Sequence, residues 1–90
     1  MDITINIPIT HRAYTNGEKT VRLSGKTVNE VLEKLVQIYP DINNKLFNNK
    51  NELHKTIEIY VNMKSAYPNE LEKEIKNGDE IQILTVLAGG

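Results

Sequence analysis

The C-terminal dipeptide is the part of this sequence with the clearest chemical use. The chain of 90 residues ends on Gly89 and Gly90, which follow a strand-like run over residues 80–87 with only Ala88 between. Glycine has no Cβ, so two in a row can pass through a narrow channel of another protein. The terminal carboxylate is ionised at neutral pH, and it resists nucleophiles until it is activated, for example as an acyl-adenylate. The pattern therefore indicates activation and attack by sulfide or an amine, with an inert, frayed end as the alternative.

No second set of catalytic or metal-binding residues stands out. The chain has no cysteine, which excludes disulfides, thiolate metal sites and a cysteine nucleophile. His11 and His54 lie far apart and lack ligand spacing, so surface or loop histidines are favoured over a metal site. Glu70, Glu72 and Glu74 indicate a solvated turn. With no phosphate-loop or Ser-His-Asp pattern, we expect a protein substrate rather than an enzyme, with no bound cofactor or metal.

The composition is that of one small globular domain. The chain is 39% hydrophobic and 26% charged, with a net charge of −1, which is unlike the basic surface of a nucleic-acid binder. No apolar run approaches the ~20 residues that span a bilayer, and the N-terminus lacks the features of a signal peptide. We therefore expect a single domain over residues 1–90, located in the cytoplasm, with no nucleic-acid or membrane partner.

Hydrophobic alternation predicts the strands. A two-residue period occurs over residues 3–7, 20–23, 56–62 and 80–87, and a short extended piece runs to Pro68. The order is strand, strand, helix, strand, short strand, strand. One helix can cover one face of such a mixed sheet, which predicts an α+β fold.

One main helix is predicted between the second and third strands. Thr27 and Glu30 have the spacing of a capping box, and apolar residues then recur at helical spacing. Asp41 is expected to cap a short second turn. Residues 11–18 are expected to form a loop, and residues 70–75 a helical turn.

The two faces of the sheet are expected to differ in burial. The side chains predicted to be buried between sheet and helix are Ile3, Ile5, Val21, Leu23, Val31, Leu32, Leu35, Ile57, Ile59, Ile81 and Ile83. The side chains predicted to lie on the opposite, largely solvated face are Thr4, Asn6, Glu58, Tyr60, Gln82 and Leu84. A register slip of one residue would exchange the two sets.

In their order, these motifs resemble those of the β-grasp, ubiquitin-like sulfur carriers. The resemblance rests on the N-terminal strand, the capped helix, the strand end at 59–62, the turn at 77–81 and the ending at 87–90. In these motifs the chain is similar to the molybdopterin synthase small subunit and to the sulfur carriers of thiamine and cysteine biosynthesis. The resemblance implies a β-grasp (ubiquitin-like) α+β domain, in which one main helix covers one face of a mixed sheet of four or five strands, followed by a flexible tail at about 85–90.

The resemblance also implies a series of steps at Gly90. A ubiquitin-activating-type adenylating enzyme would use ATP to adenylate Gly90, with Gly89 giving clearance behind it. A sulfurtransferase or desulfurase would then supply sulfur and leave a thiocarboxylate. An acceptor biosynthetic enzyme would receive that sulfur. The resemblance also allows the carrier to act as the small subunit of a sulfur-transferring synthase. The molybdopterin, thiamine, cysteine and tRNA-thiolation pathways all remain open.

Two other functions remain open beside the carrier. One is a ubiquitin-like modifier that is joined through Gly90 to lysines, and the other is a β-grasp binding module with an inert tail. If the tail is activated, we expect the partner to dock on Tyr60 and Leu84 of the outer face and on Val86 and Leu87 of the tail. Strand propensity alone is the alternative explanation for Tyr60 and Leu84.

Overall fold

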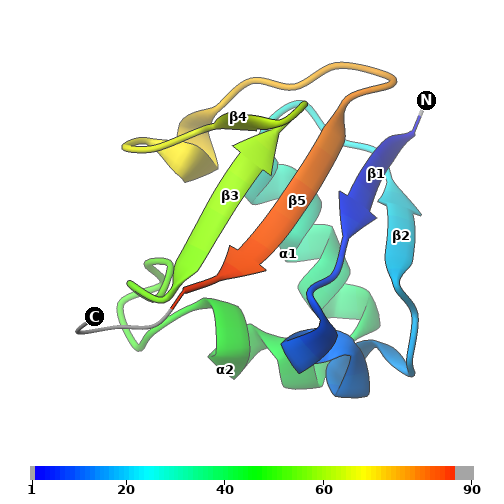
Figure 1. Ribbon diagram of the computed structural model, residues 1–90, viewed down its shortest axis with the longest axis vertical. Coiled ribbons are helices and arrows are strands. Elements are labelled where there is room, and N and C mark those ends of the chain that lie inside the picture. Colours follow the sequence, from blue (N-terminus) through cyan, green and yellow to red (C-terminus); the bar gives the residue numbers. More distant parts are fainter. Residues whose placement is uncertain (1, 87–90) are drawn as a thin grey trace.

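A mixed sheet forms one layer of the molecule (Figure 1). The computed structural model describes residues 2–86, and within them 5 strands follow the order β2-β1-β5-β3-β4. The central strands β1 and β5 are parallel, and the other neighbours are antiparallel. The strands are β1 (Ile3–Asn6), β2 (Thr20–Leu23), β3 (Ile57–Val61), β4 (Lys64–Ser65) and β5 (Glu80–Thr85). This arrangement confirms the predicted mixed sheet.

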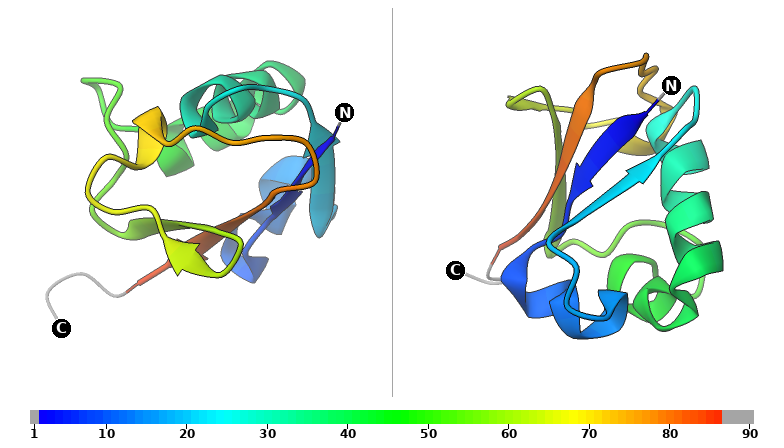
Figure 2. Two further views of the ribbon diagram at one scale, coloured as in Figure 1. Left: turned by 90° about the horizontal axis from the view of Figure 1, so that it is seen from above. Right: turned by 90° about the vertical axis from the view of Figure 1, so that its right-hand side faces the viewer.

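One helix covers a single face of this sheet, as Figure 2 shows from the side. It begins after Thr27, whose Oγ1 accepts a hydrogen bond from the Glu30 backbone N–H at 3.2 Å, so the predicted N-cap is confirmed. The helices are α1 (Val28–Ile38) and α2 (Asn43–Leu46), with the 3₁₀ helices η1 (Ile9–Thr15), η2 (Pro40–Ile42) and η3 (Glu70–Glu72). No helix formed by residues 2–86 has the length and apolar character needed to cross a membrane.

Three local predictions were wrong. The short strand β4 lies at Lys64–Ser65, ahead of the extended piece that was expected to run to Pro68. Residues 9–15 form η1, where a loop over 11–18 was expected. Tertiary contacts decide this, because His11 is buried and its Nε2 lies 3.2 Å from the Lys45 carbonyl oxygen. Asp41 lies inside η2, and neither η2 nor α2 has a side-chain cap. The chain enters η2 through Pro40, which suits the first position of a helix without a cap.

The core lies between the sheet and α1, largely as predicted. Val21 and Leu23 are exceptions, since both are only half-buried. They belong to β2, which is an edge strand of the sheet and has a neighbour on one side only. The side chains of the buried core are Ile3, Ile5, Ile7, Val28, Val31, Leu32, Leu35, Ile42, Leu46, Phe47, Ile57, Ile59, Val61, Ile75, Ile81 and Ile83.

Candidate functional site at the end of strand β5

The sheet holds the chain up to the start of the C-terminal tail. β5 ends at Thr85, which faces Ile57 of β3. One residue further, the Val86 N–H donates a hydrogen bond of 2.8 Å to the Thr56 carbonyl oxygen. The sheet therefore positions the chain through Val86. The flexible tail expected at about 85–90 stays a prediction, because residues 87–90 lie outside the described residues.

The residues expected to react lie beyond this point. Leu87, Gly89 and Gly90 fall outside the described residues, so the roles expected of them stay predictions. What the structure does place is the strand that leads to them and the surface around its end.

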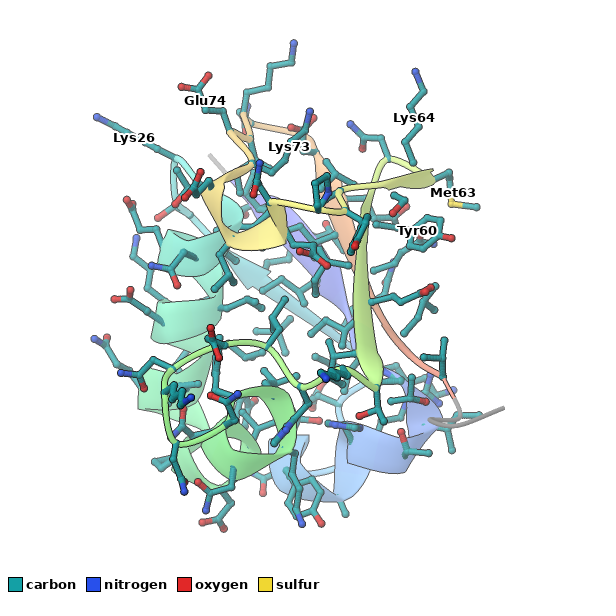
Figure 3. The ribbon with its side chains drawn as sticks, turned by 90° about the vertical axis from the view of Figure 1, so that its left-hand side faces the viewer. Lys26, Tyr60, Met63, Lys64, Lys73 and Glu74 are labelled. Carbon is teal, nitrogen blue, oxygen red and sulfur yellow. The ribbon has the colours of Figure 1, made fainter. Side chains whose placement is uncertain are left out.

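Two of the expected docking residues share the outer face of the sheet. Tyr60 faces Gln82 across the β3–β5 pair, and Leu84 faces Glu58, so Tyr60 and Leu84 are diagonal neighbours. Figure 3 shows Tyr60 on the side of the sheet away from α1. Leu84 is 40% exposed and Val86 38% exposed, while Tyr60 is half-buried. The predicted register of this face is confirmed, and its use for docking stays a prediction.

An exposed isoleucine that the sequence analysis missed lies at the same end of the molecule. β1 runs parallel to β5, with Asn6 beside Gln82, and leads directly into η1 (Figure 1). Ile9, the first residue of η1, is 77% exposed. Its position continues the odd-numbered series of buried isoleucines, so the two-residue period gave no sign of exposure. The alternation of burial continues through Ile7, but Ile9 begins η1 instead of continuing β1, and this turns its side chain outward.

A basic side chain is also fixed at this end. Arg12 of η1 donates a hydrogen bond from Nε to the Ile7 carbonyl oxygen at 3.0 Å. This bond holds the guanidinium stem against the end of β1. Together with Ile9, it gives the surface beside the β5 end both an apolar and a cationic group for a partner to contact.

The start of β5 is fixed by a hydrogen-bonded cluster of polar side chains. The Asp79 carboxylate accepts hydrogen bonds of 2.9 Å from the Asn62 amide and the Lys76 backbone N–H. Asn62 Oδ1 in turn accepts the Glu80 N–H at 2.9 Å. The Asn62 amide, and after it the Lys76 N–H, hold the pKa of the Asp79 carboxyl below its ordinary value of 3.8. This Asn62–Asp79 cluster ties the β3–β4 turn to β5 and so helps to set the register of β5 against β3.

The histidines serve the fold. His11 was expected at the surface or in a loop, but it is 8% exposed, with Nδ1 2.9 Å from Thr10 Oγ1. His54 donates from Nε2 to the Asn44 carbonyl oxygen at 2.8 Å. Within residues 2–86 no group of His, Asp and Glu side chains is arranged to hold a metal ion.

Comparison with known protein families identifies the group to which this site belongs. A sequence model of the ThiS family matches residues 5–90. The chain belongs to the ThiS family. It is 34% identical over 93 residues to the sulfur carrier protein CysO of Mycobacterium tuberculosis, and the match covers 100% of both chains.

Solved structures agree with membership of the ThiS family. A chain of the Amycolatopsis orientalis BexX/CysO complex superposes with a TM-score of 0.87 at 36% identity, covering 98% of this chain and 99% of that chain. The small archaeal modifier protein SAMP1 of Methanosarcina acetivorans superposes with a TM-score of 0.85 at 28% identity, covering 99% and 96%. These likenesses confirm the β-grasp, ubiquitin-like sulfur-carrier resemblance. The named relatives are small carriers and a modifier rather than enzymes, in agreement with the expectation of a protein substrate.

Proposed function

We propose that this protein is a sulfur carrier that is activated at Gly90 and holds sulfur there as a thiocarboxylate. The observation that carries the proposal is the C-terminal strand of a ThiS-family member. The sheet holds this strand through Val86, and only Leu87 and Ala88 separate Val86 from the Gly-Gly ending. The CysO relative, matched along its full length, supports a carrier role and favours cysteine biosynthesis among the possible pathways.

The chemistry needs a partner, because a carboxylate is a poor electrophile. An adenylating enzyme would join the Gly90 carboxylate to the AMP part of ATP, releasing pyrophosphate. A sulfur donor would then attack the carbonyl carbon and displace AMP, leaving the thiocarboxylate. This chain would bind the enzyme through the surface around Leu84 and Val86 and present Gly90, while the energy would come from the phosphoanhydride of ATP.

The test is intact-mass analysis of the purified protein. We expect the mass increase of one oxygen-to-sulfur exchange after incubation with ATP, a cognate adenylating enzyme and sulfide, and no increase when ATP is omitted. Formation of the acyl-adenylate without any gain of sulfur, with a competent donor present, would count against the carrier function.

A modifier function is the second candidate, because SAMP1 has the same fold at 28% identity. It shares the adenylation step but ends in an isopeptide bond between Gly90 and a lysine of another protein. Proteolysis of cell extracts separates the two functions. Trypsin cuts this chain for the last time after Lys76, so a conjugate would leave a remnant of residues 77–90 on the target lysine. Such remnants, if they depend on Gly90, would support the modifier, and thiocarboxylate alone would support the carrier. If the tail reacts in neither assay, the remaining alternative is a β-grasp binding module with an inert tail.

A further inference from the structure

The outer edge of β3 is covered along only part of its length. β4 pairs with Tyr60 and Val61, and the chain then turns away toward η3. A groove, here called the β3 groove, opens beside the uncovered part and is lined by residues 51–55, 57–59, Ser65 and 67–72. Figure 3 looks onto this edge of β3, with the η3 segment above and the loop before β3 below, both on the α1 side of the strand.

Among the residues that the structure describes, two backbone groups on this edge have no hydrogen-bond partner. Thr56 and Asn62 bond to β5, through the Val86 N–H and the Glu80 carbonyl, so the odd-numbered residues between them direct their backbone groups outward. The Ile57 N–H donates to His54 at 3.0 Å, and the Ile59 carbonyl accepts from Ala66 at 2.9 Å. No hydrogen bond between described residues uses the remaining pair, the Ile57 carbonyl and the Ile59 N–H.

This pair fits one residue of a parallel strand. In a parallel ladder, a residue donates its N–H to the carbonyl before its opposite residue and accepts from the N–H after it. A residue lying opposite Glu58 therefore satisfies both the Ile57 carbonyl and the Ile59 N–H. An antiparallel strand would need both groups of a single residue, and one group of Ile57 and one of Ile59 are already bonded.

The walls of the β3 groove decide what kind of segment fits. Leu53 and Leu71 are half-buried on its two sides and offer apolar contact. The acidic side chains that line it outnumber the single basic one, Lys55. They are Glu52, Glu58, Glu70 and Glu72. An extended segment that alternates apolar and basic residues matches both features.

The groove is also continuous with the site at the end of β5. Thr56, which accepts the Val86 N–H, directly precedes Ile57 of the groove. A protein that receives the C-terminus can therefore reach the β3 groove from the same side.

We infer that the β3 groove binds an extended, lysine- or arginine-bearing segment of a partner protein as a short parallel strand beside Glu58. The segment contributes two backbone hydrogen bonds, to the Ile57 carbonyl and from the Ile59 N–H. Its apolar side chains contact Leu53 and Leu71, and its basic side chains meet the glutamates of the rim.

The test is an NMR titration of the full chain with the peptide acetyl-Lys-Val-Lys-Val-Lys-amide. We expect chemical-shift changes centred on residues 57–59 and slower hydrogen exchange of the Ile59 amide. The same peptide with an N-methyl group on its central lysine cannot donate to the Ile57 carbonyl and should bind at least about threefold more weakly, since one hydrogen bond is worth ~1 kcal/mol. Shift changes centred elsewhere, no binding at millimolar peptide, or equal binding of the methylated peptide would overturn the inference.

A matched pair of variants tests the charges. Replacing the rim residues by Glu70→Gln and Glu72→Gln should weaken binding about three- to tenfold, because each exposed charge pair contributes modestly. The control combines Glu18→Gln and Glu30→Gln, which are exposed residues outside the groove with the same change in net charge. If both variants lose the same amount of affinity for the peptide, the attraction is non-specific, which would contradict a site at the β3 groove. Circular dichroism and melting temperature confirm that each variant is folded.

Discussion

Asn62 and Asp79 show how single side chains fix the position of strand β5. They lie 17 residues apart and join directly through a hydrogen bond of 2.9 Å. Asn62 lies in the β3–β4 turn with a φ of 52°, in the left-handed region that asparagine tolerates better than most residues. The Asn62–Asp79 cluster thus combines backbone conformation with side-chain bonding. A shift of β5 by one residue would break it and would also turn Leu84 to the inner face.

At the residue scale, Asp79 should give the stability a defined pH dependence. Because its pKa is lowered in the folded state, the stabilisation is present above the unfolded pKa of about 3.9 and is lost as the pH falls through the folded pKa. We expect Asp79→Asn to lower the free energy of unfolding at pH 7 by about 1 kcal/mol, through the weakened bonds to Asn62 and Lys76. The difference from the native chain should shrink below about pH 4. Urea unfolding from pH 7 to 3 measures it, and a difference independent of pH would contradict the role of the charge.

The outer-face prediction also concerns single residues. Tyr60→Ala should reduce adenylation about tenfold or more, because aromatic anchors contribute strongly to interfaces. The fold should persist, since Tyr60 is only half-buried. Ile38→Ala is the control, as Ile38 is 51% exposed on α1, on the other side of the molecule. ATP–pyrophosphate exchange with the adenylating enzyme is the measurement. If Tyr60→Ala supports ATP–pyrophosphate exchange at the native rate, the adenylating enzyme does not dock on Tyr60.

At the scale of elements, the connection from β2 to α1 depends on close packing. A Cβ built on Gly25 lies 2.6 Å from Val31 Cγ2 and 3.3 Å from the Val31 backbone nitrogen. Glycine is therefore required here by the approach of the connection to the first turns of α1. Lys34 strengthens the same contact, donating from Nζ to the Ser24 carbonyl oxygen at 2.7 Å. The orientation of α1 over the sheet is set by this connection as well as by the core.

Gly25→Ala should therefore destabilise the protein. Overpacking of this kind costs about 1–3 kcal/mol, because Val31 has to move away from a well-packed position. Gly17→Ala is not a neutral comparison, since Gly17 has a φ of 82° and a Cβ would be strained there for a different reason. The better control is Ser24→Ala at the adjacent position. It removes an exposed hydroxyl and its 3.2 Å hydrogen bond from Lys34 Nζ, and it keeps the bond of Lys34 to the Ser24 carbonyl oxygen. In thermal unfolding, Gly25→Ala should lower the melting temperature more than Ser24→Ala does. An unchanged melting temperature in the Gly25 variant would contradict the close approach.

At the scale of the whole molecule, the parallel pair β1–β5 brings two distant segments to one end. Both strands finish at this end, where β1 leads into η1 (Figure 1). η1 carries Ile9 and Arg12, and Leu84 and Val86 lie at the end of β5. The groove beside Glu58 opens on the edge of β3 near the same end. The surface around the end of β5 is therefore assembled from segments near both ends of the chain.

Deleting Gly90 tests the function of the whole molecule. The deletion moves the terminal carboxylate back by ~3.5 Å along an extended chain. A positional error of 1 Å can cost ~100-fold in rate, so adenylation should be abolished. The melting temperature should be unchanged, because the deletion leaves the described core intact. Replacing Gly89 by leucine should impair adenylation although the carboxylate remains. Robust ATP–pyrophosphate exchange by the Gly90 deletion would rule out both the carrier and the modifier.

The sequence by itself determined the elements whose signals are local. The alternation of Ile3, Ile5 and Ile7 and the cap formed by Thr27 predicted β1 and α1 correctly. The helical stripe and the strand periods also identified most of the core. Such patterns are readable because each reflects the backbone period of one element and the burial of one of its faces.

Only the tertiary structure decided features that depend on which strands become neighbours. The half-burial of Val21 follows from its place on an edge strand, and the exposure of Ile9 follows from where pairing with β5 stops. The Asn62–Asp79 cluster and the uncovered edge beside Glu58 likewise join or separate segments that are distant in sequence. Periodicity carries no information on strand order, because each period is satisfied by burial against any apolar neighbour. The packing of all elements together selects that neighbour.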